Sequence, residues 1–183
     1  IQSELYDNVF VVAGDEVSEF VLSGFNAFQA MSDLPCKPYS KNRTGVSLGE
    51  ATAAVLISAE AKNAKIKVIG DSSINDANHI SGPSRTGEGL FRSIQNALKE
   101  AQIEANKLDY ISAHGTATPF NDEMEAIAFS RLGLQKVPVN SLKGFYGHTL
   151  GASGLLETVI AIESANENRL FESKGFDEIG VSE

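Results

Sequence analysis

Two segments, His114-Gly-Thr-Ala-Thr-Pro-Phe-Asn-Asp122 and Asn140-Ser-Leu-Lys143-Gly-Phe-Tyr-Gly-His148, decide how the rest of the chain is interpreted. Each histidine comes after a short apolar run, at 109–113 and 137–140, that has the length of a strand. The small residues beside each histidine let a ligand approach the backbone closely. We therefore expect two strand ends that present the histidines in loops, where catalytic and binding residues are common.

The whole chain is predicted to form an α/β layered domain, because predicted strands and helices alternate in its second half. The run 9–13 is continuously apolar, as in a strand covered on both faces. Helix 151–165 is apolar over most of its circumference, which indicates burial between layers. The expected strands are 9–13, 51–60, 67–70, 109–113 and 137–140, and the expected helices are 15–31 (weakened at Gly24), 88–102, 122–132 and 151–165.

Composition is typical of a single globular domain. The chain has 183 residues, 42% of them hydrophobic and 21% charged, which suffices for one sizeable core. A formal net charge of −9 with scattered basic residues argues against nucleic-acid binding. No apolar run approaches the roughly 20 residues that span a bilayer, and no signal peptide is seen, so we expect a cytoplasmic protein with no membrane partner. The single cysteine, Cys36, fits a reducing compartment.

The histidine segments carry the residue types of an anion-stabilising site. His114 and His148 can donate hydrogen bonds to a developing oxyanion, or one can donate while the other moves a proton. Lys143 adds a positive charge suited to an enolate or a carboxylate. Thr116 and Thr118 alternate along an extended segment, so their hydroxyls are expected on one side, where they can bind a polar, amide-bearing arm.

Each of these residues also has a plain structural interpretation. Asp122 and Glu125 are a helical step apart at the start of a predicted helix, where Asp122 can simply be the N-cap. Lys143 can be an exposed surface lysine. Either histidine taken alone can be a structural residue whose ring is satisfied by hydrogen bonds. The spacing of the set favours the functional interpretation.

Both segments resemble the two histidine motifs of the β-ketoacyl-acyl-carrier-protein synthases, the condensing enzymes of fatty acid and polyketide assembly. The matching patterns are His114-Gly-Thr-Ala-Thr-Pro-x-Asn-Asp122 and Asn140-Ser-x-Lys143-x-x-x-Gly147-His148-x-x-Gly-Ala152-x-Gly154. The likeness extends to Cys36-Lys-Pro-Tyr-x-Lys-x-Arg43-x-Gly-x-x-Leu-Gly-Glu50, which is similar to the loop opening the second half of that family's fold, and to Asp76-x-x-His79. It covers almost the whole chain.

The resemblance implies a thiolase-like fold of two duplicated halves, stacked as α/β/α/β/α layers and normally dimeric. Residues 1–35 would be the end of the N-terminal half, and residues 36–183 most of the C-terminal half. A homodimer, or a heterodimer with a related subunit, is expected for the full-length enzyme. We expect no cofactor in the chain, because the family's phosphopantetheine is carried by the partner, an acyl carrier protein.

The resemblance also implies roles. A cysteine nucleophile takes an acyl group from a thioester, and the carbanion from a decarboxylated malonyl thioester then attacks it. By position, His114 and His148 match the histidines that hold the malonyl carbonyl, and Lys143 matches the lysine that orders them. The substrate-binding Thr116 and Thr118 match the threonines that bind the phosphopantetheine arm, and Asp122 and Glu125 match the supporting carboxylates behind them.

The family's nucleophile would lie upstream of the run 9–13 and is missing here, so this chain is expected to be an inactive fragment. Cys36 stands in a loop with no following helix to lower its pKa, which argues against its being the nucleophile. The glycine-rich segment near the family's C-terminus is absent too.

Three other interpretations remain. The first is a non-catalytic partner subunit of the same fold, resembling a chain-length factor, and the retained histidines and Lys143 disfavour it. The second is a metal site of His79, His114 and His148, which lack the local spacing of the usual zinc motifs. The third is a degradative thiolase, whose second cysteine near the C-terminus has no counterpart before Glu183.

Overall fold

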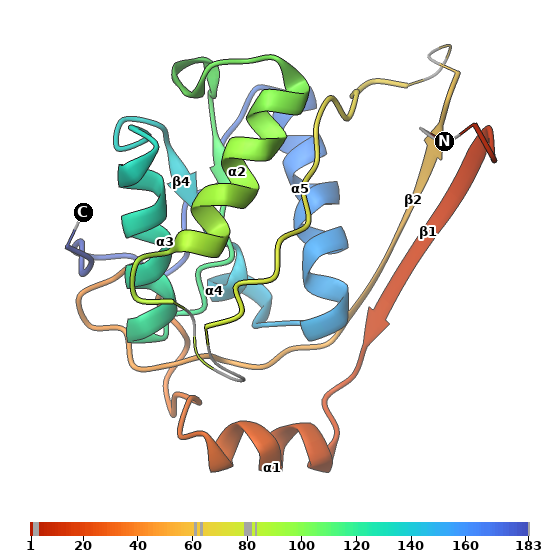
Figure 1. The fold of residues 1–183 in the computed structure, drawn as a ribbon. Coiled ribbons are helices and arrows are strands. Elements are labelled where there is room, and N and C mark those ends of the chain that lie inside the picture. The colour runs from red at the N-terminus through yellow and green to blue at the C-terminus, as the bar shows by residue number, and fades with distance from the viewer. Residues whose placement is uncertain (2–3, 61, 63, 79–81, 83, 183) are drawn as a thin grey trace.

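The computed structural model describes every residue except 2–3, 61, 63, 79–81, 83 and 183, and it confirms a mixed α/β fold (Figure 1). The strands are β1 (Asn8–Asp15), β2 (Ala51–Ser58), β3 (Ile111–Ser112) and β4 (Val139–Asn140). The α-helices are α1 (Glu19–Ala27), α2 (Glu88–Ala101), α3 (Pro119–Arg131), α4 (Lys143–Tyr146) and α5 (Ser153–Glu167), and the 3-10 turns are η2 (Ala105–Lys107) and η3 (Leu150–Ala152).

Strands β1 and β2 form a long antiparallel pair, with Asn8 opposite Ser58 and Asp15 opposite Ala51. Exposed and half-buried residues alternate along β1, so only one face of this strand is covered. The prediction that this strand is covered on both faces is therefore wrong. Phe10 is 67% exposed, because nothing among the described residues packs over it.

The second sheet places the histidine loops side by side. Strands β3 and β4 are parallel, with Ile111 opposite Val139 and Ser112 opposite Asn140. The N–H of Ala113 donates to the carbonyl of Asn140 at 2.9 Å, which extends the pairing toward the first loop. Both strands are shorter than predicted. Parallel strands present their carboxyl ends at the same edge, so both loops start there.

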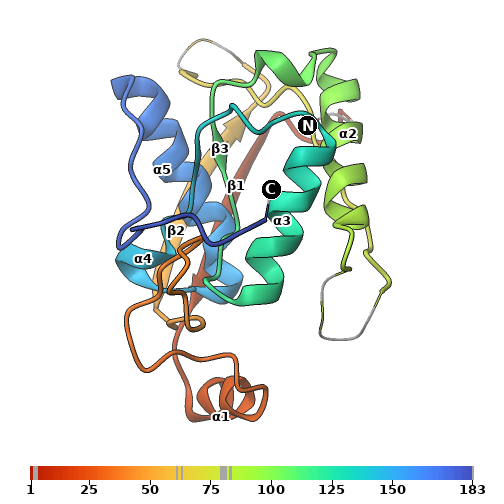
Figure 2. The ribbon, with the colours of Figure 1, turned by 90° about the vertical axis from the view of Figure 1, so that its left-hand side faces the viewer.

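Helix α5 contacts both β2 and β3, and all three are labelled in Figure 2. The sequence correctly predicted a helix between layers, but its apolar residues are half-buried rather than buried. The fully enclosed positions are Ser153 and Ser164. Helix α1 stands apart from this body in both views (Figures 1 and 2) and has no buried residue.

Helices α2 and α3 pack together and close the core on the other side. Helix α2 matches the prediction for 88–102 to within one residue, with Lys99 and Glu100 exposed. The core cluster joins Tyr39, Ala113, Phe129 and Leu134. Helix α2 is amphipathic: its apolar residues Leu90 and Ile94 pack against the core, and its charged side faces water.

Three other predictions of elements need correction. The segment 67–70 is not a strand, since it pairs with no other described strand and Val68 is 70% exposed. Helix α1 is shorter than 15–31: it is capped by Ser18 and ends at Ala27, with Gly24 inside it. Helix α3 begins at Pro119 rather than 122, because proline at a first helical position needs no N–H partner.

Among the described residues, no helix is both long enough and apolar enough to cross a membrane.

Candidate active site

The carboxylate of Glu125 holds the backbone of the first histidine loop. The N–H of His114 donates to Oε1 of Glu125 at 2.9 Å, and the N–H of Gly115 donates to Oε2 at 2.7 Å. The side-chain amide of Asn121 and the hydroxyl of Tyr39 donate to the same Oε2, each at 2.9 Å. A buried carboxylate with four donors fixes the conformation of this loop.

Asp122 holds the next turn of the same loop. Its Oδ1 accepts from the N–H groups of Thr116 and Ala117 at 3.0 and 3.2 Å, and its Oδ2 accepts from the N–H of Tyr39 at 2.8 Å. The interpretation of Asp122 as the helix N-cap is wrong, because Thr118 occupies that position. Asp122 instead satisfies three N–H groups that no strand or helix pairs.

Burial and nearby charges shift the pKa values of the three groups that hold the loop, Asp122, Glu125 and Tyr39. Burial raises the pKa of Asp122 and of Glu125, while the hydrogen bonds they accept act in the opposite direction. Burial also raises the pKa of Tyr39 well above its usual value, and the charges of both carboxylates add to this. Tyr39 therefore keeps its proton and remains a donor to Glu125.

Lys143 is buried, so its interpretation as an exposed lysine is wrong. Its Nζ donates to the carbonyl oxygen of His114 at 2.5 Å and to Oε1 of Glu157 at 2.6 Å. The two charged side chains are 0% and 12% exposed. The ammonium is thus paired with a carboxylate from α5 and acts on the histidine loop through a backbone carbonyl.

The second histidine is fixed by a close crossing of two backbone segments. The N–H of His148 donates to the carbonyl of Ser47 at 2.7 Å, and the carbonyl of His148 accepts from Gly49 at 3.1 Å. Gly147 has φ +80°, and a Cβ there would lie 2.6 Å from the carbonyl oxygen of Leu48. Only glycine permits this approach, which explains the Gly-His pair.

The ring of His148 has a defined tautomer. The N–H of Leu150 donates to its Nδ1 at 3.1 Å, so Nδ1 is an acceptor and carries no proton in the neutral ring. The single ring proton then lies on Nε2. That nitrogen is available as a hydrogen-bond donor.

The two imidazoles that the sequence singled out do come together. Their ring centroids are 4.9 Å apart and the rings are nearly perpendicular, at 80°. Desolvation and then the charge of Lys143 lower the pKa of His114 to about 3 and that of His148 to about 4, although Asp15 acts to raise the latter. At neutral pH the site offers two neutral rings, which can donate N–H groups to a forming oxyanion.

The hydroxyls of Thr116 and Thr118 lie 2.8 Å apart, so they do face the same side. The reason differs from the one expected. Ala117 between them has φ +64°, and Gly115 before them has φ +36°, so this segment is a folded turn rather than an extended strand.

Cys36 is buried, and its Sγ donates to the carbonyl of Lys143 at 3.1 Å in a segment that no helix follows. A thiol in this position is closed to a thioester. The metal interpretation involves His79, which lies outside the described residues. Within the described part of the chain, no group of three potential ligands is placed to hold a metal ion.

Sequence reasoning missed three residues of the site. Tyr39 lies inside the quoted 36–50 motif, but nothing in its surroundings Cys-Lys-Pro-Tyr-Ser-Lys indicated that its hydroxyl bonds a carboxylate. Glu157 could have been found as one of two carboxylates, with Glu163, in the largely apolar helix 151–165. Ser153, whose Oγ lies 3.0 Å from Nδ1 of His148, stands at an unspecified position of the second motif.

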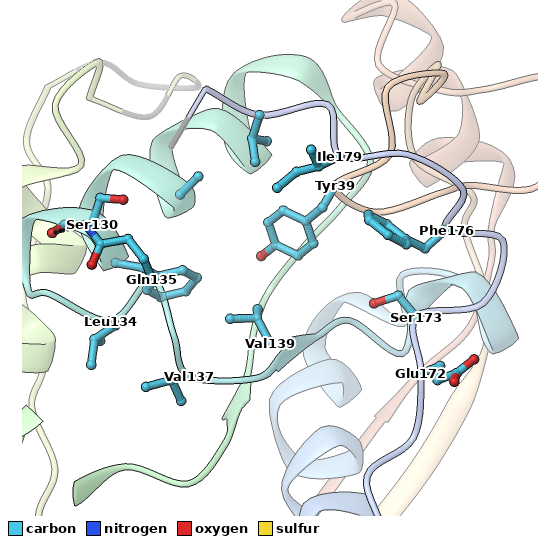
Figure 3. A pocket seen from close by; sticks show the side chains of 13 residues that line it. Tyr39, Ser130, Leu134, Gln135, Val137, Val139, Glu172, Ser173, Phe176 and Ile179 are labelled. Carbon is cyan, nitrogen blue, oxygen red and sulfur yellow. Dashed lines mark hydrogen bonds between the residues drawn. The ribbon is translucent and has the colours of Figure 1, made fainter. Parts of the chain in front are cut away.

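A cavity of about 560 Å³ lies on the other side of Tyr39, between α3 and the C-terminal segment 172–181 (Figure 3). Phe176 and Ile179 border it, and Val137 and Val139 form its floor beside β4. Neither histidine lines this cavity. Its lining includes Ser130, Gln135 and Ser173 but no histidine, lysine or arginine, so we assign the chemistry to the histidine pair.

The family described as "Beta-ketoacyl synthase, C-terminal domain" matches residues 64–177. The chain belongs to the β-ketoacyl synthase family. The match includes both histidine segments and Lys143, and it agrees with the family that the sequence motifs indicated.

One named relative and one solved structure show how similar this β-ketoacyl synthase chain is to other members of the family. It is 36% identical over 178 residues to a 3-oxoacyl-[acyl-carrier-protein] synthase 2 of Coxiella burnetii, covering 88% of this chain and 43% of that protein. A β-ketoacyl synthase structure from Burkholderia phymatum STM815 superposes with a TM-score of 0.90 at 29% identity, covering 98% of this chain and 46% of that one. The chain therefore spans less than half the length of these relatives.

Two further structures are complexes of ketosynthases. One is a ketosynthase with its chain length factor from Xenorhabdus doucetiae, with a TM-score of 0.86 at 29% identity over 98% of this chain and 47% of that one. The other is a type II polyketide synthase acyl-carrier protein with its ketosynthase, with a TM-score of 0.83 at 28% identity over 98% and 50%. Relatives of this β-ketoacyl synthase chain thus occur in assemblies with partner proteins.

Proposed function

We propose that this chain is the malonyl-activating half of a 3-oxoacyl-[acyl-carrier-protein] synthase, which performs a decarboxylative Claisen condensation in fatty acid or polyketide-type synthesis. The observation that carries the proposal is the approach of the His114 and His148 rings to 4.9 Å, with both rings neutral. Two N–H donors at that separation suit one carbonyl oxygen that gains negative charge.

The proposed reaction follows from that arrangement. When the malonyl thioester loses carbon dioxide, the electron pair of the broken C–C bond moves into an enolate, and its charge collects on the thioester oxygen. Neutral imidazoles stabilise this oxygen without giving up a proton. The enolate carbon then attacks the acyl thioester on a cysteine of the longer protein, which forms the new C–C bond and releases the thiolate.

The remaining residues have supporting roles in this proposal. Lys143 positions His114 through the carbonyl that it binds, because its own charge is paired with Glu157. Thr116 and Thr118 present paired hydroxyls that suit the amides of a phosphopantetheine arm. The proposed partner that carries this arm is an acyl carrier protein.

The test uses a longer protein that contains this chain with its upstream residues. His114→Ala and His148→Ala should each slow decarboxylation of malonyl-acyl carrier protein by about 10²–10³-fold, measured as release of carbon dioxide. Ser164→Ala, which changes a buried hydroxyl without a described partner, is the control. Decarboxylation at the parent rate in either histidine variant would refute the proposal. The 183-residue chain alone should not condense.

A chain-length-factor-like subunit is the alternative, and one solved relative is part of such a complex. The assembled pair of histidines and the relationship to named synthases both favour the enzyme. The residue at the upstream turn of the longer protein separates the two functions. A cysteine there supports the synthase, whereas glutamine or another residue supports the partner subunit.

Four other expectations stay predictions. They are the cytoplasmic location, the dimer, the lack of a bound cofactor, and the boundary between halves at residue 36.

A further inference from the structure

The first residue of α5 lies against the ring of His148. Ser153 is 4% exposed, and its Oγ lies 3.0 Å from Nδ1 of His148. The N–H of Leu150 donates to the same Nδ1 at 3.1 Å. Because an unprotonated ring nitrogen only accepts, the hydroxyl must be the donor in its contact with His148.

The neighbours of Ser153 leave its proton free for this bond. The N–H of Thr149 donates to Oγ of Ser153 at 3.1 Å, and Oγ1 of Thr149 lies 3.1 Å from the same atom. If the Thr149 hydroxyl also donates, both lone pairs of Oγ are used, and its one hydrogen points to the histidine. Every polar group in this small network then has a partner.

We propose that Ser153 is a positioning residue for the condensation, and that its hydroxyl fixes His148 in the tautomer whose proton lies on Nε2. Two donors on Nδ1 disfavour a proton there both in the other neutral tautomer and in the imidazolium ion. The N–H that faces away from α5 is thereby held ready for the thioester oxygen. This catalytic consequence rests on the proposed function, but the tautomer does not.

Other charged groups also act on this ring. Lys143 opposes a positive charge on His148, whereas the carboxylate of Asp15 from β1 favours one. The His114 ring packs edge to face against it. The contribution of Ser153 must therefore be measured as a difference between variants in which these three groups are unchanged.

The experiment compares Ser153→Ala with Ser164→Ala in the longer protein. Ser164 is a matched control, because it lies in the same helix, is 2% exposed, and its hydroxyl has no partner among the described residues. Histidine labelled with nitrogen-15 reports the protonation of each ring nitrogen by NMR, and His148→Asn assigns the signals. In the parent protein, Nε2 of His148 should carry the proton at neutral pH.

Loss of the Ser153 hydroxyl should raise the pKa of His148 by about 0.5–1 unit and move its Nδ1 resonance, because one hydrogen bond to the neutral ring is removed. Decarboxylation should slow about 3–10-fold at unchanged KM. Ser164→Ala should change neither. A parent spectrum with the proton on Nδ1 would overturn the proposal without any variant, and so would an unchanged His148 signal in Ser153→Ala or equal changes in both variants.

The spectrum separates this inference from the proposed function. If the His148 signals respond as expected but the longer protein does not decarboxylate malonyl thioesters, the positioning of the ring stands and the proposed reaction fails. If the protein decarboxylates them and the His148 signals do not respond, the reaction stands and the role of Ser153 fails.

Discussion

The histidine site and the β1–α1 segment, residues 8–27, have opposite relations between polarity and burial. In the site, Asp122, Glu125 and Lys143 are 0%, 3% and 1% exposed. In the β1–α1 segment, Phe10 is 67% and Phe20 is 87% exposed. The site buries charge because an irregular loop has N–H groups and carbonyls that need partners. The apolar segment is exposed because no described residue covers it.

The two regions should therefore respond differently to single substitutions. The loops of the site are fixed inside the chain by charged hydrogen bonds, so their geometry should respond strongly to single changes. The backbone of β1 is paired with β2, but large apolar side chains of the β1–α1 segment such as Phe10 and Phe20 are already in water. Single changes of these exposed side chains should therefore have little effect on this chain.

The largest effect is expected for Lys143→Met. It leaves the Glu157 carboxylate buried without its partner and should lower the free energy of unfolding by about 4 kcal/mol, measured by denaturant titration. Glu157→Leu in the same chain should restore part of the loss. The exposed pair Lys41–Glu178 provides the control, since Lys41→Met should cost less than about 1 kcal/mol. Equal losses of unfolding free energy in Lys143→Met and Lys41→Met would contradict the prediction that the buried ion pair matters more than the exposed one.

Glu125→Gln should lower the free energy of unfolding by about 3 kcal/mol, because an amide group would replace an oxygen toward which buried donors point. The measurement is again denaturant unfolding. Glu163→Gln, an exposed glutamate of α5, is the matched control and should be neutral. A neutral Glu125→Gln would mean that the carboxylate does not hold the His114 loop.

The pH dependence of the site should follow its lowered histidine pKa values. Both rings should stay neutral at pH 6, with NMR midpoints near 4 for His148 and near 3 for His114. Since the unfolded chain takes up these protons near pH 6.5 and the folded chain does not, each ring contributes a loss of stability as pH falls from about 6.5, down to about 4 for His148 and about 3 for His114. Histidine-to-asparagine variants should lack this contribution, and ordinary midpoints near 6.5 would contradict the buried pair.

The smallest effect is expected for Phe20→Ser on α1. In the 183-residue chain it should change the free energy of unfolding by less than about 0.5 kcal/mol, because the ring is already in water. Denaturant unfolding of the chain measures it, with Phe129→Ser in the core as the contrasting variant. A loss comparable to that of Phe129→Ser would show that α1 packs more tightly than its exposure indicates.

The sequence predicted elements where the pattern depends on local chemistry. The stripe that gave α2 and the glycines beside His148 are of this kind, because helix periodicity and close backbone approach are local requirements. The approach of the His114 and His148 rings was predicted from the two histidine motifs. The strand expected at 67–70 failed because a strand exists only beside a partner, and the burial of β1 failed because cover comes from elsewhere in the fold.

The fine structure of the site was less accessible from sequence. The N-cap was considered for Asp122 because the helix was expected to start at 122, although Pro119 carried the stronger start signal. The bonds of Tyr39 to Glu125 and of Ser153 to His148 join residues whose side-chain orientations depend on the packed loops. No periodicity encodes such contacts.

Helix α5 is linked to both imidazole-bearing segments. Its first residue contacts one ring directly, and one turn later its glutamate steadies the other through an ammonium and a carbonyl. A change at the start of this helix would therefore reach both donors, although α3 also holds the loop of the first ring and residues 47–49 also hold the backbone of the second. Transplanting the pair into another scaffold would require moving residues 143–157 as one piece with the turn at 114–118.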